Sequence, residues 1–135
     1  MALPNQPFRK IICVDFDGVL HSYTSGWKGA ANIPDPPVPG ALPWLISIAA
    51  KHSVNIYSAR SGQGGIDAMK AWLIHHLGAH LDPDQAYTFV EMELEFPLAK
   101  PSAFLTIDDR AICFKGDFTE LTPEYLSNFK AWWQK

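Results

Sequence analysis

Two short apolar runs, each followed at once by acidic residues, constrain the fold of this chain more than any other feature. The first run covers residues 10–14 (KIICV) and the second covers residues 104–107 (FLTI). The acidic residues that follow them are Asp15 and Asp17 after the first run, and Asp108 and Asp109 after the second. Short apolar runs rich in β-branched residues are typical of strands buried on both faces of a parallel sheet. The sequence therefore predicts such a sheet, with carboxylates where its strands end.

The remaining segments predict an α/β fold. Further strands are expected at residues 54–58 (VNIYS), 86–90 (AYTFV) and 111–114 (AICF). Residues 91–96 (EMELEF) either prolong the strand before them or form an edge ribbon. Helical spacing of apolar residues predicts helices over 41–52 and 66–77, and a last helix that is capped by Thr122 and buries Leu126, Phe129 and Trp133. Strands alternating with helices indicate a Rossmann-like parallel sheet of about five strands flanked by helices, with right-handed crossovers.

Length and composition indicate one globular domain over residues 1–135. A chain of 135 residues fits a single core, and 47% hydrophobic with 19% charged residues is typical of a folded protein. The Gly- and Pro-rich segment 20–40 is expected to be a flap, and no segment is long enough to form a cap domain. No apolar run reaches the ~20 residues of a membrane span, and the N-terminus lacks the features of a signal peptide. We expect a cytoplasmic protein with no membrane partner.

The ends of the predicted strands carry a set of polar groups suited to phosphate chemistry. Parallel sheets of this class bind ligands at the carboxyl ends of their strands. The groups expected there are Asp15, Asp17, Ser58, Lys100, Asp108 and Asp109. Clustered carboxylates repel one another, and Mg²⁺ converts that repulsion into binding because it prefers carboxylate, water and phosphate oxygens. A hydroxyl, an ammonium group and Mg²⁺ together suit the oxygens of a phosphoryl group.

Four motifs in order, ICVDFDGVL, NIYSAR, AKP and FLTIDDR, resemble those of the haloacid dehalogenase-like superfamily of phosphohydrolases. The resemblance covers roughly residues 10–114. It implies that Asp15 is the nucleophile that becomes an aspartyl-phosphate, and that Asp17 protonates the leaving group and then activates water. It further implies that Ser58 and Lys100 hold the phosphate. The Mg²⁺ ligands it implies are Asp15, the Asp17 backbone carbonyl and Asp108, with Asp109 as a co-ligand or close neighbour.

Two of these assignments leave alternatives open. Only seven residues separate Lys100 from Asp108, whereas many members of the superfamily place a helix there, so Lys115 or Arg60 could take over part of the role of Lys100. Asp109 could instead pair with Arg110.

The flap contains the residues that we expect to touch the substrate beyond its phosphate: Tyr23, Trp27 and Lys28, with Arg60 as a further candidate. Without a cap domain the site is open, so either a large substrate, such as a phosphorylated nucleic-acid end or a protein, or a second subunit covers it. Trp132 and Trp133 are expected to pack in the core. The competing interpretations are a receiver-like module that only accepts a phosphoryl group, and an inactive member of the superfamily that serves as a binding domain.

Overall fold

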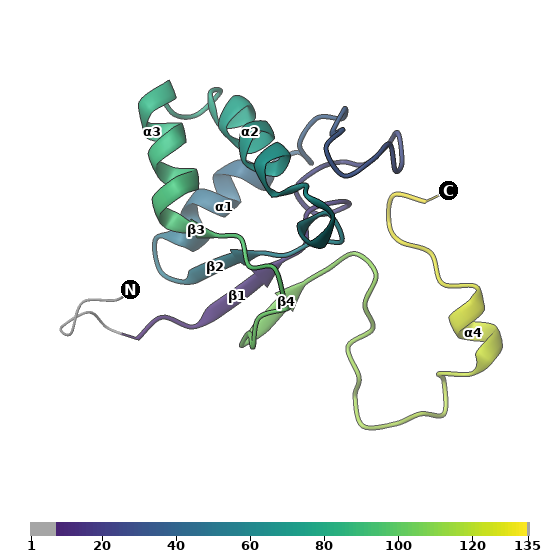
Figure 1. Cartoon of the computed structure of the whole chain (residues 1–135). Helices are drawn as coiled ribbons and strands as arrows, with labels where there is room; N and C mark the ends of the chain where they lie inside the picture. Colours follow the sequence, from purple (N-terminus) through teal and green to yellow (C-terminus); the bar gives the residue numbers. More distant parts are fainter. Residues whose placement is uncertain (1–7, 135) are drawn as a thin grey trace.

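The structure, a computed structural model, describes residues 8–134 and contains one four-stranded parallel sheet (Figure 1). Its strands are β1 (Ile11–Val14), β2 (Ser53–Ile56), β3 (Leu94–Glu95) and β4 (Leu105–Ile107), in the spatial order β3-β2-β1-β4. The predicted α/β class is confirmed, with four strands among the described residues rather than about five. β1 has a strand on either side, so the residues that follow it lie at the middle of the carboxyl edge of the sheet.

The two faces of the sheet differ in polarity. Paired residues on neighbouring strands point to the same face, so Ile12 shares a face with its partners Val54 and Leu105. The other face carries Cys13 beside Asn55 and Thr106. The expectation of strands buried on both faces is confirmed for β1 and β2, whose last three residues are buried. It is wrong for β4, where Leu105 is exposed.

Three helices lie together on one side of the sheet (Figure 1). They are α1 (Ala41–Ala49), α2 (Ile66–Leu77) and α3 (Pro83–Thr88). The first two agree with the predicted helices 41–52 and 66–77, although α1 ends earlier. The spacing of Met69, Leu73 and Leu77 places them on one face of α2, and all three are fully buried in the core. These helices cover the apolar face and leave the carboxyl edge of the strands free for the site.

The strand predicted at 86–90 is wrong. Asp82 accepts a hydrogen bond from the backbone N–H of Gln85, whose side chain bonds back to the backbone N–H of Asp82. This capping box, with Pro83 at the first helical position, begins α3. A single π-helical turn, η2 (Phe89–Glu93), follows. β3 then lies within residues 91–96 and pairs only with β2, so the edge-ribbon alternative is the correct one.

The C-terminal segment also departs from the prediction. Residues 111–114 form no strand, and Cys113 is exposed. The last helix, α4 (Pro123–Ser127), has Thr122 as its N-cap as expected, and the Thr122 hydroxyl accepts from the Tyr125 N–H. It is short and buries no residue, and Figure 1 shows it standing apart from the sheet. The apolar spacing at 126–133 therefore does not mark a helix packed on the core.

The flap 20–40 is an irregular loop that is anchored at its base. Leu20 and His21 are fully buried, and the backbone bonds Ser22 N to Pro36 O and Val38 N to Leu20 O tie its two ends together. Between residues 8 and 134, no helix has the length and apolar character needed to cross a lipid bilayer.

Candidate active site

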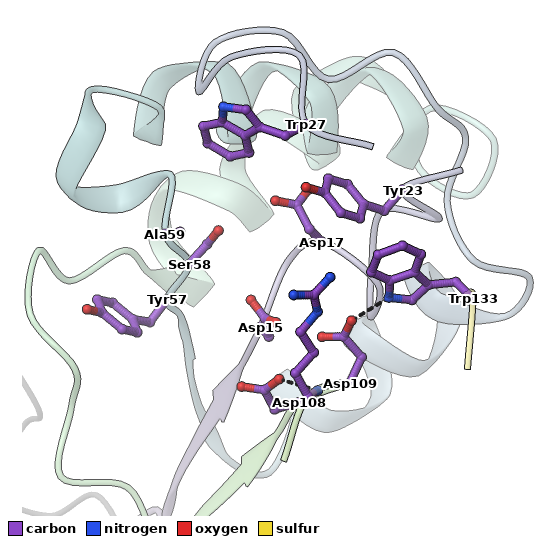
Figure 2. A pocket seen from close by; sticks show the side chains of 11 residues that line it. Asp15, Asp17, Tyr23, Trp27, Tyr57, Ser58, Ala59, Asp108, Asp109 and Trp133 are labelled. Carbon is purple, nitrogen blue, oxygen red and sulfur yellow. Dashed lines mark hydrogen bonds between the residues drawn. The ribbon is translucent and has the colours of Figure 1, made fainter. Parts of the chain in front are cut away.

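A cavity of about 330 Å³ opens at the carboxyl edge of the sheet, next to the ends of β1, β2 and β4 (Figure 2). Its lining residues are Asp15, Asp17, Tyr23, Trp27, Tyr57, Ser58, Ala59, Asp108, Asp109, Arg110 and Trp133. Asp15, Asp108 and Asp109 lie on one side, and the flap residue Trp27 lies on the opposite side. Asp15 and Asp108, which are 93 residues apart in sequence, thus meet here because β1 and β4 are neighbours in the sheet.

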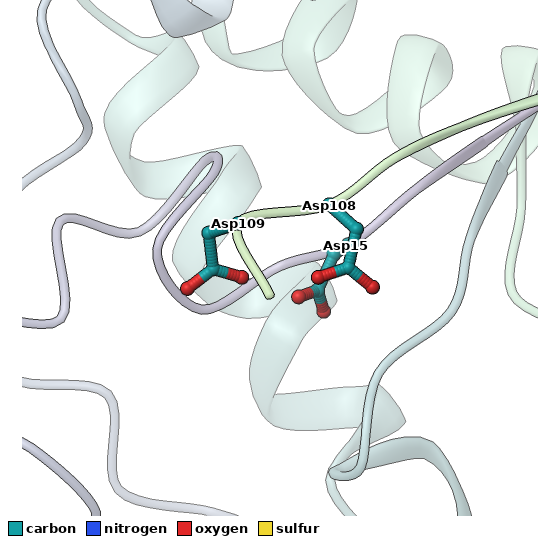
Figure 3. Close-up of side chains that lie close together, drawn as sticks. All are labelled: Asp15, Asp108 and Asp109. Atoms are coloured by element: carbon teal, nitrogen blue, oxygen red, sulfur yellow. The ribbon is translucent and has the colours of Figure 1, made fainter. Parts of the chain in front are cut away.

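Three of the predicted acids form one cluster (Figure 3). Asp15, Asp108 and Asp109 each place a carboxylate oxygen within 4.8 Å of the others. Asp15 also accepts a hydrogen bond of 2.7 Å from the Phe16 N–H, and Asp108 accepts one of 2.8 Å from the Arg110 N–H. These bonds hold the carboxylates in place, and hard oxygen donors at this spacing suit a divalent cation such as Mg²⁺.

Burial raises the pKa of the Asp15 carboxyl from 3.8 to about 8, and its hydrogen bond to the Asp109 carboxyl adds to the rise. The charges of Asp108 and Asp109 act in the same direction, while the Phe16 N–H opposes them. The shift expresses the cost of placing a further negative charge in this cluster. The site is therefore unfavourable for three free carboxylates, and a bound cation would relieve that cost.

Asp17 lines the same cavity but stands outside the three-acid cluster. One of its oxygens lies 2.9 Å from Arg60 Nε, and the other lies 2.9 Å from His21 Nδ1. Its side chain is 14% exposed, so it is held from behind and still faces the cavity. This arrangement separates Asp17 from the three-acid cluster and leaves its carboxylate facing the cavity.

The two predicted phosphate-binding residues differ in their placement. Ser58 follows β2, is buried, lines the cavity, and accepts a hydrogen bond from the Arg60 N–H at 3.2 Å. Lys100 is exposed and does not line the cavity. It lies in the connection that crosses from β3 to β4. Burial raises the pKa of the Cys13 thiol, and the charge of Asp15 adds to this rise.

The predicted substrate residues divide in the same way. Tyr23 and Trp27 line the cavity, whereas Lys28 and Arg60 do not. Lys28 is exposed on the flap. Arg60 is fully buried, with its guanidinium carbon 4.8 Å from the centre of the Trp27 ring, so it supports the flap instead of reaching the cavity.

Trp133 is the main cavity residue that the sequence did not indicate as functional. Its Nε1–H donates to Asp109 at 2.5 Å, and its ring packs edge-on against Tyr23 with the centroids 5.1 Å apart. The Arg110 guanidinium lies over this ring instead of pairing with Asp109. Trp132 is exposed, and its Nε1–H donates to the Gly18 carbonyl at 2.7 Å. The expected core role of both tryptophans is therefore wrong.

Tyr57 and His21 were also missed. Tyr57 directly precedes Ser58 at the end of β2, and both line the cavity, so the strand-end rule that identified Ser58 applies equally to its neighbour. His21 lies four residues after Asp17, and no pattern in the sequence shows that the turn after β1 brings the two together.

No protein-family model, curated protein or solved structure matches this chain.

Proposed function

We propose that this protein is a magnesium-dependent phosphomonoester hydrolase that works through an aspartyl-phosphate on Asp15, as the motif resemblance to haloacid dehalogenase-like phosphohydrolases implies. The observation that carries the proposal is the cluster of Asp15, Asp108 and Asp109 at the carboxyl edge of a parallel sheet, with Asp17 and Ser58 lining the same cavity. We also propose that the four-stranded parallel sheet belongs to the Rossmann-like class. Both cysteines are unpaired, which fits a reducing cytoplasmic compartment.

The position of Asp15 supports its role as the nucleophile. It directly follows the central strand, and its Oδ1 is fixed by the Phe16 N–H. In the first step an Asp15 oxygen bonds to phosphorus while the bond from phosphorus to the ester oxygen breaks. In the second step water attacks the same phosphorus and the acyl phosphate bond breaks, which releases inorganic phosphate and restores Asp15. The hydroxyl of Ser58, at the end of the neighbouring strand, would hold a phosphoryl oxygen.

The cation fits the donor set. Asp15, Asp108 and Asp109 supply the carboxylates, and the Asp17 carbonyl is the further ligand that the resemblance implies. Mg²⁺ bound there would offset the charges of these carboxylates and of the phosphate, so that Asp15 is deprotonated at neutral pH. The raised pKa of Asp15 in the metal-free chain is the physical reason to expect this dependence.

Asp17 is placed for proton transfer. Its carboxyl lines the cavity two residues after Asp15 and does not belong to the acidic cluster. It would give a proton to the departing ester oxygen in the first step and take one from the attacking water in the second. These two transfers leave Asp17 in its starting state after one turnover.

The walls of the cavity favour a substrate that extends beyond its phosphate. Tyr23, Trp27, Tyr57 and Trp133 surround the acidic floor, and no separate lid domain is present among residues 8–134. Aromatic side chains beside a phosphate site can stack on nucleobases. We therefore propose a large phosphorylated substrate that covers the open site, and a nucleic-acid end suits the aromatic walls better than a protein.

The test is phosphate release from an aryl phosphate with Mg²⁺ or with excess chelator. The parent should release phosphate only with Mg²⁺, and Asp15→Asn should keep the fold while turnover falls by roughly three orders of magnitude or more, because the covalent route is lost. Asp117→Asn is a suitable control, since Asp117 is an exposed aspartate outside the cavity. Turnover by Asp15→Asn at the parent rate would contradict the mechanism. A stable phosphoprotein without phosphate release would indicate a receiver-like acceptor instead.

A further inference from the structure

Arg60 joins the flap to Asp17. Its side chain is fully buried, and its Nε–H donates to both oxygens of Asp17, at 3.1 and 2.9 Å. Its Nη1 donates to three flap carbonyls: Gly29 at 2.8 Å, Ala30 at 3.0 Å and Asn32 at 3.2 Å. The partners of Nε and Nη1 thus come from two different segments, whereas Nη2 is buried without a hydrogen-bond partner. Displacement of the flap would leave this charge without its carbonyl partners.

His21 holds the same carboxylate from the other side. Its Nε2 accepts the Asp35 backbone N–H at 3.1 Å, so the ring proton is on Nδ1, which donates to Asp17 at 2.9 Å. Asp35 is itself fixed, because its carboxylate accepts from the N–H and the hydroxyl of Ser25, and its carbonyl accepts from Trp72 Nε1. Both donors that orient Asp17 therefore depend on the flap for their own positions.

We propose that Arg60 is a positioning residue that couples the flap to Asp17. The Asp17 carboxyl keeps its orientation toward the cavity while the carbonyls of residues 29–32 hold the guanidinium, and it loses that orientation when the flap moves away. This inference rests on the proposed function, in which Asp17 transfers the proton. The Asp17 carboxyl is then oriented for proton transfer only when the flap is closed over a substrate.

The substitution Gly65→Ala tests this coupling without removing any hydrogen-bonding group. A Cβ on Gly65 would lie 2.7 Å from the Ala30 carbonyl oxygen and 2.8 Å from Arg60 Cβ, so it must push the flap and Arg60 apart. Its φ of −94° is accessible to alanine, so the contact is the main effect. Gly62→Ala is the matched control in the same turn, since a Cβ there meets nothing within 4 Å.

The readout is turnover of an alkyl phosphate compared with p-nitrophenyl phosphate. Only the alkyl ester needs a proton on its leaving oxygen, so Gly65→Ala should slow the alkyl ester by roughly tenfold or more and the aryl ester by less than about threefold. Gly62→Ala should slow neither. Equal slowing of both esters, or no slowing, by a folded Gly65→Ala protein would overturn the proposal.

A second variant covers the case in which Gly65→Ala does not fold. Arg60→Lys keeps the charge but cannot reach Asp17 and the flap carbonyls together, so it should show the same selective loss on the alkyl ester. Arg9→Lys is its control, because Arg9 bonds to the Ala49 carbonyl at the far end of α1. If Arg60→Lys slows the alkyl ester relative to the aryl ester no more than Arg9→Lys does, the proposed coupling of the flap to Asp17 is wrong.

Hydrogen exchange separates this inference from the proposed function. If the parent releases no phosphate, the proposed function fails, yet the coupling remains measurable. Gly65→Ala should then increase deuterium uptake in peptides covering residues 20–40 at least twofold relative to Gly62→Ala, because the flap loses its anchor on Arg60. Equal uptake in the two variants would overturn the coupling by itself.

Discussion

Asp15 shows how the fold changes the chemistry of a single residue. In the unfolded chain it is an ordinary carboxyl with a pKa near 3.8, and in the folded chain burial and its bond to Asp109 raise that pKa to about 8. The folded protein therefore binds a proton that the unfolded chain has released, and this difference persists between those two pKa values. Above the upper value both states are ionised, and the folded state carries the full cost of the buried charge.

The metal-free protein should accordingly lose stability as the pH rises from about 4 to about 8, through Asp15 alone. Asp15→Asn removes this titration, so its free energy of unfolding relative to the parent should increase steadily across that window. Urea unfolding in excess chelator at about pH 5 and about pH 8 measures the difference.

Asp117→Asn is the control for this experiment. The pKa of Asp117 is lowered below 3.8 by its hydrogen bonds to Thr119, so it stays ionised above pH 5 in both states. The effect of its substitution should not change between the two pH values. If the effect of Asp15→Asn on the free energy of unfolding were also the same at both pH values, the pKa of Asp15 would not be raised in the folded protein.

At the scale of elements, the turn after β1, the end of β4 and the C-terminal segment meet at Gly18. Trp132 donates to the Gly18 carbonyl, and Trp133 donates to Asp109 beside it. A Cβ on Gly18 would lie 2.2 Å from Asp109 Oδ2 and 2.7 Å from Trp133 Nε1. The close approach of the acidic cluster to β1 therefore requires glycine at this position.

Gly18→Ala should displace Asp109 and weaken Mg²⁺ binding by roughly tenfold or more, measured by calorimetry alongside the melting temperature. Gly26→Ala is a matched control, because Gly26 also has a positive φ, 72° against 81°, and a Cβ there meets nothing within 4 Å. Both variants carry the same backbone strain of about 1 kcal/mol, so the difference between them reports the contact with Asp109 and Trp133. Equal Mg²⁺ affinities would contradict this interpretation.

At the scale of the whole molecule, the open cavity and its aromatic walls bear on substrate size. Trp27 is 44% exposed at the cavity, beyond the carboxylates, where only a substrate larger than its phosphate would reach it. Large apolar side chains are also exposed at the start of β4 and along the C-terminal segment: Phe104, Leu105, Phe114, Phe118, Leu126 and Phe129.

We expect kcat/KM to be higher for a 5′- or 3′-phosphorylated oligonucleotide than for the matching mononucleotide. The same ratio is measured for a phosphopeptide and its phospho-amino acid, as a comparison with a protein substrate. Trp27→Ala should lower the value for the oligonucleotide about fivefold to tenfold through loss of stacking, with little effect on the mononucleotide. Tyr87→Ala, at an exposed aromatic residue on α3, is the control. A monomeric enzyme that prefers the mononucleotide would exclude the large substrate.

The sequence alone determined the features that depend on local patterns. The apolar runs before Asp15 and Asp108 were sufficient to predict β1 and β4, and strand-end position was sufficient to bring Ser58 to the same edge. The apolar spacing of α2 gave its bounds. For β1 and α2 the pattern reflects burial along a single element, which the sequence of that element records directly. The run before Asp108 predicted β4 by its apolar, β-branched character alone, because Leu105 is exposed.

Only the tertiary structure decided which groups face the cavity and which support it. Arg60 follows Ser58 by two residues, but its partners are carbonyls of the flap, whose positions no local pattern specifies. Trp133 reaches Asp109 because the C-terminal segment returns to the site, while Lys100 stays outside because its segment crosses the sheet elsewhere. These placements depend on contacts between distant segments, and the physical reason is that such contacts compete with local propensity and are settled only when the whole chain has packed.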